Sequence, residues 1–208
     1  MKQLFATATV ATALVLAVTT PGLAQTKTWD IDSSHSAASF AVKHLMVATV
    51  RGEFGKLSGR VSFDGKDFAG VKAEATIDAS TINTREPKRD EHLKSPDFFD
   101  VATYPTITFT SKRAESAGPN KFRLIGDLTM RGVTKEVALD VEATAPVKGM
   151  RGETRMGAQA TTRINRQDFG VKWNRSLDAG GVVVGDEVTV TIDLSLVEKS
   201  DAAAKPSN

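Results

Sequence analysis

Apolar and polar residues alternate along most of this chain with a period of two. The stretch 71–79 shows the pattern most clearly, and the stretches 122–130, 137–143 and 188–196 repeat it. A β-strand points successive side chains to opposite faces, so this period is typical of a strand with one buried and one solvated face. The alternation therefore predicts a chain built from strands that each turn one face toward a core.

Turn-forming residues separate these stretches where hairpins require them. Weaker alternation covers 57–63, 106–110 and 156–164, and we expect short strands at 29–31 and 36–44. The turn residues between the predicted strands are Asp64-Gly65, Ala117-Gly118-Pro119-Asn120, Arg131-Gly132, Lys148-Gly149 and Ala179-Gly180-Gly181. About eight strands joined by such turns, without alternating helices, predict an all-β antiparallel sandwich or barrel.

One connection, residues 84–100, breaks the alternation. Asn83-Thr84 is predicted to cap a short helix or helical turn that begins at Glu86-Pro87 and stops at Ser95-Pro96. The segment places three apolar side chains beside a dense cluster of charges: Leu93, Phe98 and Phe99. A solvated connector that tucks these side chains into the core is the common behaviour of such a segment. The alternative is a flap over the mouth of a barrel.

The first residues predict export. Residues 4–18 are almost wholly apolar after the positive charge of Lys2, but the run is shorter than the roughly 20 residues that a membrane-spanning helix needs. Gly22 and Ala24 occupy the small-residue positions of a signal-peptidase site, so we predict cleavage after Ala24. We expect a signal peptide over 1–24, one domain over 25–199, a disordered tail over 200–208 and a periplasmic location, with no integral membrane span.

Composition excludes several classes of function. The formal net charge is only +2, with basic and acidic residues interleaved, so no basic stripe for nucleic acid is present and we expect no nucleic-acid partner. The absence of cysteine excludes disulfides and thiolate metal sites. The sequence separation of His35 and His44 is odd, which points them to opposite faces of a continuous strand. We therefore expect neither a metal nor a cofactor.

Small residues recur on the faces predicted to point inward. Ala73, Ala75 and Ala79 share one such face, Gly126 lies on another, and Ala158 and Ala160 lie on a third. An eight-stranded barrel is either filled by its own side chains or holds one ligand, so the size of these residues decides between the two. The sequence favours a cavity. Ten phenylalanines and two tryptophans could fill the interior instead, and that alternative stays open.

Four blocks of sequence resemble one known family. They are Trp29-Asp30-Ile31-Asp32-Ser33-Ser34-His35-Ser36, the run from Lys88 to Asp100 with Tyr104-Pro105, the run from Gly126 to Lys135, and the run from Ile164 to Val171 with Trp173. In this order they resemble the YceI-like family of periplasmic, lipocalin-like proteins, over essentially all of 29–196. The resemblance implies an extended eight-stranded antiparallel barrel around an apolar pore that holds a polyisoprenoid or another long-chain lipid.

Candidate ligand-binding residues follow from this implied pore. The predicted wall consists of Phe40, Val42, Phe54, Phe63, Ile77, Phe109, Leu124, Leu128, Phe169, Trp173 and Val190, with Leu93, Phe98 and Phe99 closing one end. A lipid head group could meet His35, Arg89, Arg131 or Arg166, because guanidinium matches phosphate bidentately. The favoured alternative is a structural role, in which Arg89 with Asp90 and Arg166 with Asp168 form ion pairs or backbone clamps at the ends of the barrel.

Three functions remain after the sequence alone. The first is a carrier or store for an isoprenoid lipid, for instance a quinone, and it is not an enzyme. The second is a hydrolase that acts on a lipid ester, although the chain lacks a Gly-x-Ser-x-Gly nucleophile elbow. The third is a structural or stress-response barrel with a filled core. Homodimerisation and transient contact with a membrane stay open.

Overall fold

The computed structural model describes residues 26–64, 67–178 and 180–199. The predicted signal peptide (1–24) and the predicted disordered tail (200–208) lie outside the described residues. Within the described part, no helix is long and apolar enough to cross a membrane.

All strands belong to one 12-stranded sheet whose pairings are antiparallel. The strands are β1 (Lys27–Ile31), β2 (Ala37–His44), β3 (Ala48–Phe54), β4 (Leu57–Phe63), β5 (Lys72–Asp78), β6 (Ile82–Asn83), β7 (Thr106–Gly118), β8 (Lys121–Met130), β9 (Val133–Ala143), β10 (Val147–Lys148), β11 (Thr154–Asn165) and β12 (Val184–Glu198). The helices are η1 (Phe68–Gly70), η2 (Ala79–Thr81), α1 (Pro87–Lys94) and η3 (Arg166–Phe169). The predicted all-β class with one short helix is confirmed.

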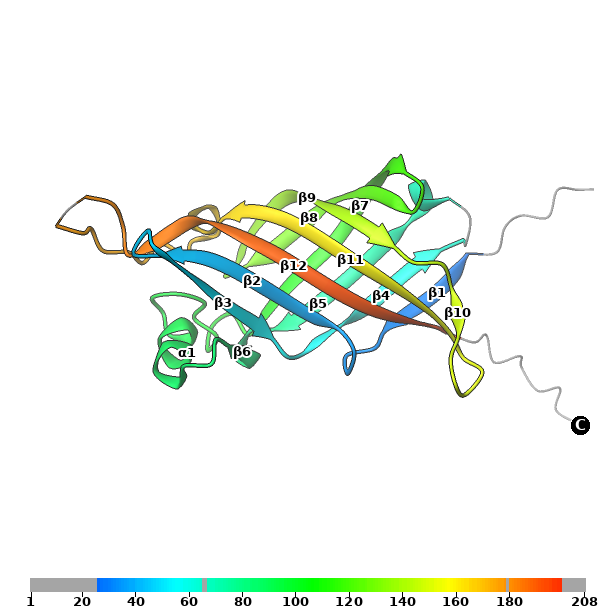
Figure 1. Cartoon of the computed structure of the whole chain (residues 1–208), viewed down its shortest axis with the longest axis horizontal. Coiled ribbons are helices and arrows are strands. Elements are labelled where there is room, and N and C mark those ends of the chain that lie inside the picture. The colour runs from blue at the N-terminus through cyan, green and yellow to red at the C-terminus, as the bar shows by residue number, and fades with distance from the viewer. Residues whose placement is uncertain (1–25, 65–66, 179, 200–208) are drawn as a thin grey trace, which may run out of the picture.

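The sheet closes into an eight-stranded barrel formed by β1, β4, β5, β7, β8, β9, β11 and β12. Strand β12 closes the ring because it pairs with β11 along one edge and with β1 along the other. Its amino-terminal half also pairs with β2, which in turn pairs with β3. The hairpin of β2 and β3 therefore lengthens one side of the barrel (Figure 1), a shape that confirms the expectation of an extended barrel.

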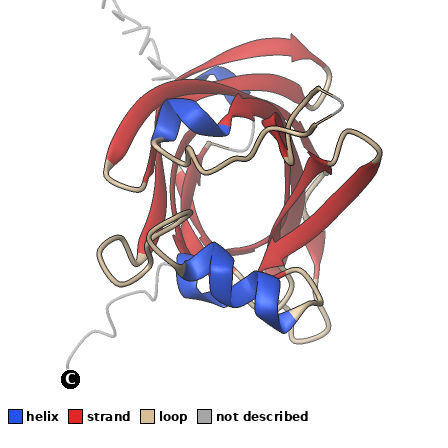
Figure 2. Cartoon of the chain, turned by 90° about the vertical axis from the view of Figure 1, so that its left-hand side faces the viewer, coloured by secondary structure: helices blue, strands red, loops and turns tan. Residues whose placement is uncertain are grey.

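Two groups of elements mark the ends of the barrel. The end called here the α1 end carries α1, the β2–β3 turn (residues 45–47) and the loop 171–183. The opposite end, called the η1 end, carries η1 and the turn between β10 and β11. Seen along its axis, the barrel is a closed ring of strands with α1 at the rim (Figure 2).

Residues in register on neighbouring strands share the inward face. Ala75 pairs with Phe109, and Phe109 pairs with Leu128, so one ring of the wall combines a small residue with two large ones. Hydrophobic clusters gather toward each end, one around Trp29 and one around Phe169. The predicted alternation therefore marks the core correctly. Strand β3 was missed because its sequence, ATVRGEF, has few large apolar residues.

The short helix forms where predicted, but its cap is different. Glu86 is the N-cap residue, and its carboxylate accepts a hydrogen bond from the backbone N–H of Lys88 at 3.3 Å. The predicted cap, Asn83-Thr84, is wrong, because the hydroxyl of Thr84 donates to Asp90 at 2.5 Å. A residue before proline is confined to extended conformations, so Glu86 before Pro87 becomes the last non-helical residue.

Gly59 on β4 lies against the backbone of β5. A Cβ at Gly59 would meet the carbonyl oxygen of Glu74 and the Cα of Ala75, and the φ of Gly59 is +149°. We expect Gly59→Ala to lower the free energy of unfolding by about 2 kcal/mol, because backbone must move and φ is strained. Urea unfolding measures this change. The matched variant Gly55→Ala, with nothing within 4 Å, should shift it by less than about 0.5 kcal/mol. Equal losses of stability in the two variants would contradict a close backbone contact at Gly59.

Candidate functional site

One cavity occupies the interior of the barrel. Its lining runs from Val42, Leu93 and Val184 at the α1 end to Phe68 and Met156 toward the η1 end. Apart from five residues, every lining residue is apolar, and those five are Ser39, Glu74, Thr108, Thr162 and Arg166. No histidine belongs to the lining. The cavity is an apolar tunnel with no cluster of reactive groups in its wall.

The volume of the tunnel is large on the scale of protein stability. The tunnel measures about 220 Å³. An empty apolar void of that size would cost about 5 kcal/mol at roughly 24 cal/mol per Å³. A whole domain has a stability of only about 5–15 kcal/mol. The tunnel therefore favours an apolar occupant.

Small side chains leave this space open. Ala73, Ala75, Ala158 and Ala160 all lie on the tunnel wall, as the sequence predicted for an interior that its own residues do not fill. The phenylalanines of the wall border the cavity without filling it. The predicted alternative of a filled core does not describe this interior.

Three stacked rings close the η1 end. The ring of Phe68 lies between those of Phe63 and Phe122, with centroids 4.6 and 4.8 Å away and interplanar angles of 4° and 11°. Helix η1 carries Phe68, and the side chain of Asp67 caps this helix by accepting from Ala69 N at 2.8 Å. The stack forms the floor of the tunnel.

The segment that follows α1 borders the tunnel at the opposite end. Leu93, Phe98 and Phe99 line the cavity there. The guanidinium of Arg131 donates to the carbonyl oxygen of Pro96 at 2.7 Å and to that of Phe98. These bonds hold the segment against the barrel, so it contributes apolar side chains to the mouth while its charged residues stay outside.

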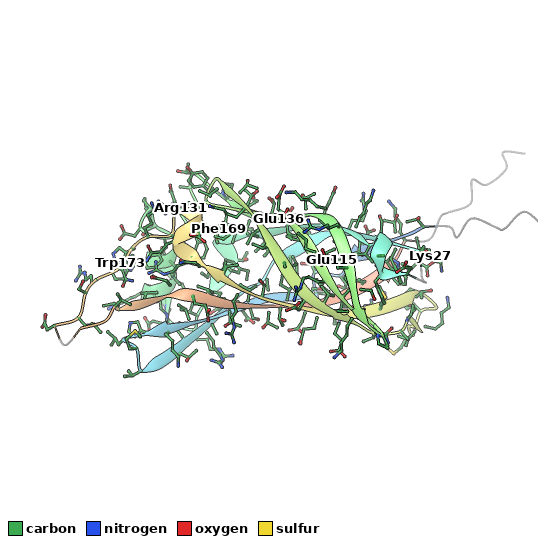
Figure 3. The ribbon with its side chains drawn as sticks, turned by 90° about the horizontal axis from the view of Figure 1, so that it is seen from above. Lys27, Glu115, Arg131, Glu136, Phe169 and Trp173 are labelled. Carbon is green, nitrogen blue, oxygen red and sulfur yellow. The ribbon has the colours of Figure 1, made fainter. Side chains whose placement is uncertain are left out.

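An aromatic contact ties α1 to the loop 171–183. The ring of His92 packs edge-on against Phe98 and Trp173, with centroids 5.0 and 5.1 Å away, and its Nε2 lies 2.8 Å from the carboxylate of Asp97. Figure 3 shows Trp173, Phe169 and Arg131 near the same end of the barrel, with Lys27 at the other. The mouth is thus framed by side chains from α1, the loop after it and the loop before β12.

Most of the predicted wall residues border the cavity. The wall contains Phe40, Val42, Phe54, Phe63, Ile77, Leu93, Phe98, Phe99, Phe109, Leu124, Leu128 and Val190. Phe169 and Trp173 were predicted there and lie elsewhere. Phe169 is buried in η3, and the ring of Trp173 packs edge-on against His92 and at a tilt against Phe98. Both follow the last residue of β11, where alternation no longer tells inside from outside. Ligand binding by the twelve others stays a prediction.

Phe68 is the wall residue that sequence reasoning missed most clearly. It follows the polar run from Asp64 to Asp67 and lies in a 3₁₀ turn, where no period identifies an inward face. A large aromatic residue inside a polar connection was the one available signal.

Arg166 is the predicted head-group residue that reaches the tunnel, and its donors are already occupied. Its side chain is buried, and all five N–H groups of the guanidinium donate to protein atoms. The acceptors are the carbonyl oxygens of Gly185, Val171, Trp173 and Val184 and the carboxylate of Asp186. Burial lowers the pKa of Arg166 despite the nearby Asp186. Arg166 is therefore a backbone clamp, as predicted, that joins Val171 and Trp173 to the start of β12. Its carboxylate partner is Asp186 instead of the predicted Asp168.

The remaining predicted head-group residues lie outside the tunnel lining. Arg89 donates from Nε to the hydroxyl of Thr84 at 2.7 Å and from Nη2 to its carbonyl oxygen at 2.8 Å, rather than pairing with Asp90. Arg131 serves the segment after α1, as described above. His35 lies in the exposed bend between β1 and β2. In the ranges that the structure describes, no three His, Asp or Glu side chains gather to hold a metal ion.

Ser34, His35 and Asp32 form a cluster whose geometry is unlike that of a catalytic triad. The Nδ1 of His35 lies 3.0 Å from the hydroxyl of Ser34 and 2.8 Å from the carboxylate of Asp32. A triad needs serine and aspartate on different ring nitrogens. The Ser34 hydroxyl, the Arg155 guanidinium and His35 hold the pKa of Asp32 well below its usual range. The cluster fixes the bend between β1 and β2.

Comparison with known proteins identifies the relatives of this barrel. The family described as "YceI-like domain" matches residues 29–196. The UPF0312 protein SAS2572 of Staphylococcus aureus (strain MSSA476) is 40% identical over 158 residues, which are 76% of this chain and 90% of that protein.

Two solved structures share the fold. The crystal structure of Burkholderia cenocepacia BcnA is 27% identical with a TM-score of 0.70, over 79% of this chain and 98% of that one. A polyisoprenoid binding domain from Saccharophagus degradans, implicated in plant cell wall breakdown, is 19% identical with a TM-score of 0.61, over 82% of this chain and 98% of that one.

The bend at Asp32 gives a pH-dependent prediction. The Asp32 side chain is only 15% exposed and accepts from Arg155 at 2.9 Å, so Asp32→Asn should lower the free energy of unfolding at neutral pH by about 1–2 kcal/mol. Because folding lowers this pKa, the carboxylate stabilises fully above its unfolded value of about 3.9 and loses that effect as pH falls toward the folded value. Urea unfolding at several pH values should show the difference shrinking below about pH 4.

The exposed pair of Arg123 and Asp140 supplies the control for this test. Asp140→Asn should change the free energy of unfolding by less than about 0.5 kcal/mol at any of these pH values. A loss in Asp32→Asn that does not vary with pH would contradict the assigned role of the carboxylate.

Proposed function

Because the chain belongs to the YceI-like family, we propose that it binds a long apolar lipid of the polyisoprenoid class inside its barrel and carries or stores that lipid without transforming it. An isoprenoid quinone is one lipid with such a chain. The observation that carries the proposal is the tunnel itself, a continuous apolar cavity walled by small and aromatic residues.

The energetics of burial support a long hydrocarbon chain as the occupant. Each methylene group removed from water contributes about 0.8 kcal/mol, so a chain that fills the tunnel needs few polar contacts. The polar atoms of Arg166 are already bonded to the protein, which leaves recognition to the shape and length of the apolar wall. The related domain from Saccharophagus degradans, with the same fold, is described as polyisoprenoid binding.

The tunnel offers little to the hydrolase alternative. Its wall has no histidine and, as carboxylate, only Glu74, whose side chain is exposed. The Ser34, His35 and Asp32 cluster lies outside the lining and has both partners on one ring nitrogen. A binding protein is the simpler account, and it needs no cofactor.

The location of the protein is part of the proposal. The apolar run of residues 4–18 and the small residues before Gln25 support export to the periplasm. A lipid carrier there would shield an insoluble chain from water between its source and its destination.

The first test is to look for the ligand. Native mass spectrometry of the mature protein, purified without detergent, should show an additional mass that dissociates as a long apolar lipid, because an empty tunnel is costly. Protein that remains free of any lipid after incubation with a polyisoprenyl alcohol or an isoprenoid quinone would contradict the proposal.

A second test blocks the tunnel from one wall position. Ala75 lies on the tunnel wall, so Ala75→Phe should reduce the bound lipid at least about tenfold by occupying its space. The same substitution at the neighbouring exposed residue, Thr76→Phe, should leave lipid binding unchanged. Quantitative native mass spectrometry measures both. If Ala75→Phe keeps its lipid and only loses roughly 1–3 kcal/mol of stability through overpacking, the site is not in the tunnel.

A further inference from the structure

Three successive apolar residues are exposed at the tip of the β2–β3 turn. The exposed fractions are 40% for Leu45, 57% for Met46 and 82% for Val47. Isolated exposed apolar residues are common, but a contiguous group of bulky ones marks a contact surface.

The backbone of this turn makes the residue types still less expected. The N–H of Val47 donates to the carbonyl oxygen of His44 at 3.2 Å, and φ is +51° at Leu45 and +61° at Met46. Positive φ at both central residues is typical of a type I′ turn, in which Asn-Gly is preferred. Leu-Met therefore strains the backbone and exposes apolar surface at the same place. Strain and exposed apolar surface at one place are typical of a contact site.

The turn is joined to the loop 171–183. The backbone N–H of Leu45 donates to the carbonyl oxygen of Val183 at 2.8 Å, and the side chain of Met46 lies against Gly181. Both segments project at the α1 end of the barrel (Figure 1). His44, directly before the turn, pairs with Val184, which lines the tunnel. The exposed tip therefore continues directly into the tunnel wall.

Exposed cations lie on the two segments that meet at this tip. Residues 43–51 and 171–178 carry four basic side chains, Lys43, Arg51, Lys172 and Arg175, and one acidic one, Asp178. Four minus one gives a local formal charge of +3, whereas the whole chain carries +2. None of the four forms an ion pair with another residue that the structure describes. The guanidinium of Arg175 lies 5.9 Å from the centroid of the Trp173 ring.

An apolar tip inside a cationic collar has the chemistry of a segment that enters a bilayer interface. Apolar side chains enter the region of the head groups, and Lys and Arg attract anionic lipids. We propose that residues 45–47, with the collar of Lys43, Arg51, Lys172 and Arg175, dock the α1 end of the barrel on an anionic lipid bilayer. This inference rests on the proposed function, because a lipid carrier must exchange its cargo with a membrane.

A second exposed turn provides a matched comparison. On β10 and the turn that follows it, Val147 is 61% exposed and Met150 is fully exposed, near Lys148 and Arg151 in the sequence. This turn lies at the η1 end, which the stacked rings of Phe63, Phe68 and Phe122 close. Docking there would place a membrane against the floor of the tunnel. The β10–β11 turn therefore serves as a control, because it has similar side chains but lies at the end of the barrel opposite the mouth.

Vesicle sedimentation of the mature protein tests the proposal. Protein should sediment with phosphatidylcholine vesicles that contain phosphatidylglycerol and bind pure phosphatidylcholine more weakly. Leu45→Asn combined with Met46→Gly should weaken binding to the anionic vesicles at least about tenfold and raise the melting temperature, because it suits the turn. Val147→Asn combined with Met150→Gly should leave vesicle binding unchanged. Equal loss in both variants, or no binding by the parent protein, would overturn the docking surface.

Lipid content separates this proposal from the function on which it rests. Native mass spectrometry should find the same bound lipid in the parent protein and in the Leu45→Asn, Met46→Gly variant, while transfer of lipid from vesicles into emptied protein slows in the variant alone. If the protein binds vesicles but never holds lipid, the proposed carrier function is contradicted and the docking surface is supported. If both proteins hold lipid and take it up from vesicles at equal rates, only the docking surface is contradicted.

Discussion

Hydrogen bonding along both edges of β12 is the interaction on which the rest of the structure depends. One edge pairs with β11 from Asn165 and Glu187 through to Arg155 and Val197. The other edge is shared by β2 and β1, which follow each other with the bend at Asp32 between them. Closing the ring fixes the width of the interior. With the width fixed, only the size of the inward side chains decides how much space remains.

That space is divided unequally along the barrel. Alanines on β5 and β11 hold the middle open, whereas Phe63, Phe68 and Phe122 stack across one end. At the other end, α1 and the loop before β12 frame the mouth through His92 and Trp173. Hydrogen bonds from Arg131 and Arg166 to backbone carbonyl oxygens hold these irregular segments in place. The guanidinium groups of these two arginines therefore bond to the protein itself. Under the proposed function, recognition of a ligand would depend on the apolar wall.

The fold was largely predictable because its signal is local. Alternation marks the inward face of β5, β8, β9 and β12 residue by residue, and the twelve wall residues on strands and around α1 follow from it or from the apolar residues beside it. The predictions that failed depend on contacts between residues that are distant in the sequence. The carboxylate partner of Arg166, Asp186, lies at the start of β12 rather than two residues away. Phe68 lies in a 3₁₀ turn, where no period identifies the inward face. Phe169 and Trp173 belong to a connection whose path only tertiary contacts determine.

The stacked floor gives the tunnel a fixed depth. Under the proposed function, a lipid chain that enters at the α1 end would stop at the rings of Phe63, Phe68 and Phe122, and the barrel would select its ligand by chain length. A chain that is too short leaves a void above the floor, and one that is too long keeps its last segment in water. Selectivity among lipids of one chemical type would then follow from the number of carbon atoms rather than from the head group.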